Sequence, residues 1–217
     1  MPTGTFSPGT GATFPVDGRV AREGALDETF TTIRTSAGNA AATGDIAQVC
    51  IVTCSTTSNQ FSAIERGIFC FDTTTIPAGN VITAGTIQFY TTAIDATLAG
   101  SVSIVVPAPA STSDLANSDY NIAGWTMTKQ ATDIAIGTIG TGAYLPFTFN
   151  ATGLANVKVA GTTIFGVVTN FDADNSAPTW SSGASSRLDI QFADAANKPQ
   201  LIVTYVPGAT GLQNKIW

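Results

Sequence analysis

The chain has 217 residues, of which 44% are hydrophobic and only 11% are charged. Its formal net charge is −6 and its Lys and Arg residues are scattered, which disfavours binding to nucleic acid or to an anionic membrane surface. The chain contains no histidine, which excludes His-based catalytic triads and the usual zinc centres.

Short apolar or alternating runs, separated by Gly, Pro, Asn and Asp, predict a series of short strands along the chain. The alternation is clearest over 187–193, where Leu188, Ile190 and Phe192 point to one side and polar residues to the other. The strands are expected at 14–21, 30–35, 47–54, 63–71, 86–92, 101–107, 143–149, 163–170, 187–193 and 200–206.

Residues 64–90, which span most of the fourth and fifth predicted strands, read as a strand, a tight turn and a second strand. Pro77 presets φ for the turn, while Gly79 and Asn80 tolerate positive φ. The carboxylate of Asp72 is expected to accept hydrogen bonds from the backbone amides that follow it, as in an Asx turn. These residues build the fold and include no catalyst.

Helical signals are few. Residues 150–160 predict a two-turn helix capped by Asn150 or Thr152, with Leu154 and Val157 on its inner face, and residues 111–122 predict one more turn. We therefore expect an all-β fold, a two-sheet antiparallel sandwich of jelly-roll type with one or two short helical turns. The expected organisation is an N-terminal arm over 1–13, a single domain over 14–207 and a C-terminal tail over 208–217.

Cysteine usage and the N-terminus bear on the cellular compartment. Cys50, Cys54 and Cys70 are interpreted as buried apolar thiols, with a Cys54–Cys70 bridge as the alternative. The first residues lack the basic and apolar regions of a signal peptide, which favours synthesis in a cytoplasm without export.

The stretch "RGIFCFDTTTIPAGNVITAGTIQFY", followed far downstream by "PQLIVTYV", resembles the DNRLRE-type β-sandwich family, which is similar to carbohydrate-binding modules. In that family an Arg-containing strand ends in Phe-Asp, leads into an Ile-Pro turn and is followed by a second strand. The domain closes with a Pro-x-Leu-x-Val-x-Tyr strand. The matching positions are Arg66, Phe71, Asp72, Ile76, Pro77, Pro199, Leu201, Val203 and Tyr205.

A second resemblance covers nearly the whole chain. The stretches "VDGRVAREGALDETFTTIRTSAG", "STTSNQFSAIERGIFCFDTT", "ATGLANV" and "FDADNSAPTWSSGASSRLDIQFADAANKPQLIVTYV" are similar to uncharacterised proteins of tailed bacteriophages. This resemblance implies a protein of the virion, released by lysis. Its implied partners are capsid or tail proteins and copies of itself.

The densest group of oxygen ligands is "NFDADNSAPTW", in which Asp172, Asp174 and Asn175 have the alternating spacing that calcium loops favour. The stretch lacks the following Gly and the distal Glu of an EF-hand. It is therefore either an Asx-rich loop or the site of one structural calcium ion, and no other cofactor is expected.

Aromatic residues supply two further candidate surfaces. Trp180, Trp125 and Tyr120 are candidates for a glycan-binding platform, although the preferred interpretation of Trp180, in its Gly/Ser loop, is that it plugs the open end of the core or packs against a neighbour. Contacts with neighbouring subunits are assigned to the two ends of the chain, through Phe6, Phe14, Ile216 and Trp217.

Taken together, these features favour a non-enzymatic structural or accessory protein of a bacteriophage virion. Capsid decoration through protein–protein contacts is the first expectation, because a surface of so low a charge suits burial against other protein. The alternative is a tail-fibre module that binds glycans or the host surface.

Overall fold

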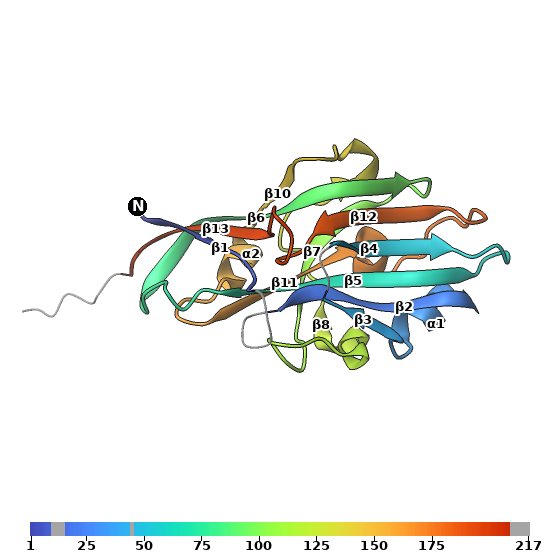
Figure 1. Cartoon of the computed structure of the whole chain (residues 1–217), viewed down its shortest axis with the longest axis horizontal. Helices are drawn as coiled ribbons and strands as arrows, with labels where there is room; N and C mark the ends of the chain where they lie inside the picture. The colour runs from blue at the N-terminus through green and yellow to red at the C-terminus, as the bar shows by residue number, and fades with distance from the viewer. Residues whose placement is uncertain (10–15, 44–45, 209–217) are drawn as a thin grey trace, which may run out of the picture.

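The computed structural model describes residues 1–9, 16–43 and 46–208, and its strands pair antiparallel throughout (Figure 1). The strands are β1 (Thr3–Phe6), β2 (Asp17–Glu28), β3 (Ala40–Ala42), β4 (Ile46–Cys54), β5 (Phe61–Asp72), β6 (Asn80–Ala96), β7 (Ser101–Pro107), β8 (Trp125–Thr126), β9 (Ile134–Ala135), β10 (Tyr144–Thr148), β11 (Thr162–Thr169), β12 (Ser185–Gln191) and β13 (Gln200–Pro207). The helices are short: α1 (Phe30–Thr35), α2 (Ala151–Asn156), α3 (Asn170–Ala173) and the 3₁₀ turns η1 (Asn117–Tyr120), η2 (Ile122–Gly124) and η3 (Ile136–Thr138).

The long strand β6 joins the two halves of the fold. Its first part pairs with β13 on one side and with β10 on the other, and its last part pairs with β12. We call β1, β13, β10 and residues 80–90 of β6 sheet A. The other sheet, sheet B, holds β12, β4, β5, β11 and β7, with β2 along the far side of β5.

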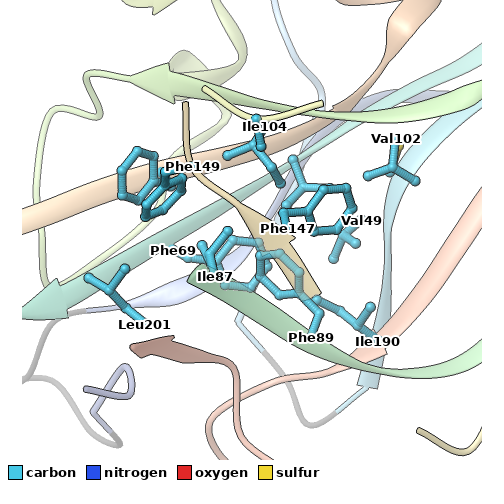
Figure 2. Packing of buried hydrophobic residues seen from close by; sticks show 14 of the residues in the cluster. Val49, Phe69, Ile87, Phe89, Val102, Ile104, Phe147, Phe149, Ile190 and Leu201 are labelled. Atoms are coloured by element: carbon cyan, nitrogen blue, oxygen red, sulfur yellow. The ribbon is translucent and has the colours of Figure 1, made fainter. Parts of the chain in front are cut away.

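Two hydrophobic clusters lie on opposite faces of β5. Phe69 and Phe71 belong to the first cluster, together with strands of sheet A, whereas Ile68 and Cys70 belong to the second. In the first cluster (Figure 2) the ring of Phe69 lies 4.7 Å from that of Phe89, measured between centroids. The prediction of an antiparallel all-β sandwich with short helical turns is confirmed.

Several local predictions are also confirmed. Leu188, Ile190 and Phe192 are buried in the first cluster. Asn150 caps α2, because its side-chain oxygen accepts a hydrogen bond from the Gly153 amide at 2.9 Å. The three cysteines are buried and unbridged.

The Asx turn is present as well. The Asp72 carboxylate accepts from the Thr74 amide at 2.9 Å and from its hydroxyl at 2.6 Å, and these bonds lower the Asp72 pKa. Gly79 adopts positive φ in the turn that follows, as its position predicted.

Two predicted segments differ from the structure. Residues 30–35, predicted as a strand, form the helix α1, because the Thr29 hydroxyl caps it and Phe30 and Ile33 bury one face. Residues 3–6, assigned to an arm, form β1 and pair with β13 of the same chain. Within the described ranges, no helix is long and apolar enough to cross a membrane.

Candidate functional site

Sheet A carries no charged side chain. Asp, Glu, Lys and Arg are absent from β1, β10, β13 and residues 80–94 of β6. Alternation buries Ile87 and Phe89, so the opposite face presents Thr, Gln, Ile and Pro side chains. The outward residues include Thr3, Thr5, Thr86, Gln88, Pro146, Thr148, Ile202 and Thr204, which are partly or fully exposed.

One end of sheet A is apolar. The large hydrophobic side chains that the described residues expose are Met1, at 88%, and Val81, at 53%. Val81 pairs with Val206 in the β6–β13 ribbon, and the Pro2 carbonyl accepts a hydrogen bond from the Tyr205 amide. An open groove of about 500 Å³ lies at this end, lined by Pro2, Pro77, Ala78, Gly79, Asn80, Tyr205, Pro207 and Gly208. Exposed apolar grooves are typical of surfaces that bind protein, membrane or a ligand.

A polar groove of about 360 Å³ opens on sheet B. The residues that line it come from four neighbouring strands and lie in one row across the sheet. In this row Ile51 of β4 pairs with Glu65 of β5 on one side and with Arg187 of β12 on the other. Arg187 pairs in turn with Asp95 of β6. A second hollow of about 400 Å³ continues it, and the two share Gly24, Thr53, Ser62 and Gly183.

Two carboxyl groups in this groove share one arginine. The Arg19 Nη1 atom lies 2.6 Å from Glu65 Oε2 and 2.9 Å from Glu23 Oε2. The pKa of Glu65 is raised to about 8, mainly because the carboxyl group is buried. The positive charge of Arg19 lowers this pKa, and the nearby Glu23 contributes to raising it. The hydrogen bond from Arg19 lowers the pKa of the more exposed Glu23. The arrangement therefore holds a proton on Glu65 at neutral pH.

We expect the free energy of unfolding to fall as the pH rises from about 5 to about 8. Burial raises the pKa of Asp17 to about 7 and that of Glu65 to about 8, from ordinary values of 3.8 and 4.5. The folded state therefore binds more protons than the unfolded state over this window. The contribution of these two carboxyl groups to stability is lost as the pH rises through their folded-state pKa values. Urea unfolding at a series of pH values measures the effect. The Asp17→Asn, Glu65→Gln double variant should show a flatter profile, and a wild-type profile that rises towards pH 8 contradicts the assignment.

A buried ion cluster occupies the second core. Asp172 is 1% exposed, and its Oδ2 and Oδ1 atoms lie 2.7 and 3.1 Å from Nε and Nη2 of Arg66, which is fully buried. Nε of Arg34 lies 3.0 Å from the same Asp172 Oδ1. Arg66 also donates to the carbonyls of Arg34 and Tyr120. These bonds tie β5, α1, η1 and α3 together.

The aromatic platform predicted from Tyr120, Trp125 and Trp180 does not form as a unit. Tyr120 is fully buried and Trp125 nearly so, with the Arg66 Cζ atom 4.1 Å and 5.6 Å from their ring centroids. Both rings cover the guanidinium group in a cation–π arrangement, so neither presents a face to a sugar. This corrects the prediction for these two residues.

The predicted calcium residues have other partners. Asp172 is held by the two arginines, and Asp174 pairs with Lys129, with 2.8 Å between Oδ1 and Nζ. Asn175 is exposed and adopts positive φ. The described part of the chain contains no cluster of three or more His, Cys, Asp or Glu side chains arranged for a metal ion. The loop is thus organised by ion pairs.

The remaining predicted residues have mixed positions. Trp180 is half-buried against the second cluster, and its indole N–H donates to the Ser55 carbonyl at 3.2 Å, beside the second hollow of the polar groove. Phe6 packs against the first cluster of its own chain and is partly exposed, and its assignment to a subunit contact stays a prediction. Phe14, Ile216 and Trp217 lie outside the described residues.

Sequence reasoning missed both the uncharged sheet and the polar groove. The absence of charge in β1, β6, β10 and β13 is visible in the sequence, but only the strand pairing shows that these segments form one surface. No protein-family model matches the chain, and no curated protein is similar enough to count as a match.

Proposed function

We propose that the chain is a non-enzymatic structural or accessory protein of a bacteriophage virion, most simply a capsid decoration protein that acts through protein–protein contacts. The observation that supports this proposal most is the uncharged outer face of sheet A, with its apolar groove at one end. Charged side chains are depleted at the centres of protein interfaces, because the free energy lost on removing an unpaired charge from water exceeds the free energy gained from the contact.

The distribution of charge supports the same function. The ion pairs of the described residues lie on sheet B, on the loops and in the second core. Sheet A can therefore be covered by another protein without breaking any of these pairs. On a repeating lattice, many weak contacts of this type act together.

Mass spectrometry of purified particles, from a phage that encodes the chain, tests the proposal. We expect the chain in the particles at a copy number comparable with that of the major capsid protein, which is the number that a decoration protein requires. A few copies per particle would move the assignment to the tail or a fibre. Absence from the particles, with the chain left in the soluble lysate, would contradict a virion role.

The alternative function is binding of glycans, as in a tail-fibre module. One arrangement favours it: hydroxyl and carboxyl groups line the polar groove, and half-buried Trp180 bonds to Ser55 at the margin of the second hollow. Polar hydrogen-bonding groups beside one aromatic ring suit a sugar.

A glycan array with Trp180→Ala as the matched variant separates the two functions. Saturable binding that the variant loses, while its folded spectrum is kept, would favour the glycan module. Absence of binding across the array, together with high occupancy on particles, is the result that we expect.

A further inference from the structure

We propose that β2 is a pH-sensitive strand, which is closed on sheet B while the carboxyl groups of Asp17 and Glu65 carry protons and opens locally over residues 17–23 when both ionise. The inference goes beyond the proposed function and does not depend on it. It assigns a conformational role to two buried carboxyl groups that lack a cation of their own.

The strand β2 lies at the margin of sheet B (Figure 1). Its residues 17–23 pair with β5, and the strand described on its other side is β3, which has three residues. The register with β5 breaks after Glu23, where Gly24 adopts positive φ. The strands β4 and β11 pair with the opposite side of β5. Residues 17–23 can therefore separate from β5 while the rest of the sheet stays paired.

Asp17 attaches the beginning of β2 to the loop that follows β12. Its side chain is buried, and its Oδ2 atom accepts a hydrogen bond from the Ala193 amide at 2.8 Å. Among the described residues, no Lys or Arg forms an ion pair with it. The charged groups that act on it are Asp194 and, more weakly, Lys198, and the thiol of Cys70 faces it from β5. An ionised Asp17 is thus a buried charge whose hydrogen-bond donors are backbone amides.

Glu65 connects the middle of β2 to β5. Because side chains alternate along a strand, Arg19 and Glu23 lie on the same face of β2, over the polar groove. Both carboxyl groups contact the single guanidinium of Arg19. The other charged residues that line the groove are Arg187 from β12 and Asp95 from β6. A neutral Glu65 leaves Arg19 with one carboxylate, whereas an ionised Glu65 places two carboxylates against one cation.

Both groups act in the same direction as the pH changes. Burial raises the pKa of Asp17 to about 7 and that of Glu65 to about 8. In an open strand both carboxyl groups regain ordinary pKa values near 4, so the closed form binds more protons. Each unit of pH below the raised values then favours the open form by about tenfold for each group. Opening removes Val20 from the second cluster, in which it is fully buried.

Hydrogen exchange of the full chain at pH 6 and pH 9, expressed as protection factors, tests the proposal. We expect the amides of residues 19–22 to lose at least about a hundredfold in protection at pH 9, while those of residues 201–204 in β13 stay far better protected. The Asp17→Asn, Glu65→Gln double variant keeps both side chains neutral, so its β2 amides should remain protected at pH 9. Asp114→Asn, which neutralises an exposed carboxyl group, should behave like wild type.

The result for β2 is independent of the virion assignment, because the isolated chain is measured. Equal protection of the wild-type β2 amides at both pH values overturns the proposal. Loss of protection in the double variant as large as in wild type overturns it too. If the β2 and β13 amides fall together to the same low protection, the chain unfolds as a whole and the local opening is wrong. Loss confined to β2, and absent from the double variant, supports it.

Discussion

Replacing Asp172 with alanine is expected to lower the free energy of unfolding by about 3–5 kcal/mol. The change leaves the fully buried guanidinium of Arg66 without its carboxylate partner, and Arg34 loses the same oxygen. Since a small domain is stable by only about 5–15 kcal/mol, the variant should be close to unfolding at ambient temperature. Urea or guanidinium titration, followed by circular dichroism, measures the loss.

Asp174→Ala is the matched control. It removes the same side chain two positions later, where the carboxylate is exposed and its pair with Lys129 is solvated. This variant should lose no more than about 1 kcal/mol of its free energy of unfolding. Equal stabilities for the two variants would show that the Arg66 cluster does not contribute as its burial implies.

Trp125→Ala is the second large effect, with an expected loss of about 3–5 kcal/mol. The ring is nearly buried in the second cluster, lies over Arg66, and donates from its indole N–H to the Asp119 carbonyl at 2.9 Å. Its removal creates a cavity beside a buried cation and leaves the carbonyl without its partner. Thermal or denaturant unfolding measures the change.

Trp180→Ala provides the comparison, because its ring is only half-buried. We expect about half the loss of Trp125→Ala or less, in proportion to the smaller area removed from water. A larger loss of unfolding free energy for Trp180→Ala than for Trp125→Ala would contradict the finding that the Trp125 ring is the more buried of the two. Because the Trp180 variant should remain folded, it is also suited to the glycan experiment.

The local parts of the fold were predictable from short patterns. Alternation in 187–193 identified the half-buried strand β12, and Asn150 identified the start of α2. The helix α1 was missed because its threonine-rich sequence has strand propensity. The missed signals were the Thr29 cap and the apolar spacing of Phe30 and Ile33.

The long-range parts were not predictable. Arg66 and Asp172 are 106 residues apart, and no local pattern indicates that they meet in the interior. For the same reason Tyr120 and Trp125 were interpreted as surface rings, although aromatic residues in loops cover buried groups as well as exposed ones. The uncharged surface likewise depends on which strands pair, and pairing between distant segments is a property of the whole sheet.

The most direct measurement of the central claim is the occupancy of purified particles by two charge variants of the chain. Thr86→Lys with Gln88→Lys adds two charges at the centre of the outer face of sheet A, and Thr56→Lys with Ser58→Lys adds the same two at the exposed β4–β5 turn (Figure 1). If contacts are made through sheet A, the first variant should lose at least about tenfold in occupancy, because charge buried at an interface is costly, and the second should match wild type. Full occupancy by the folded sheet A variant would contradict the account.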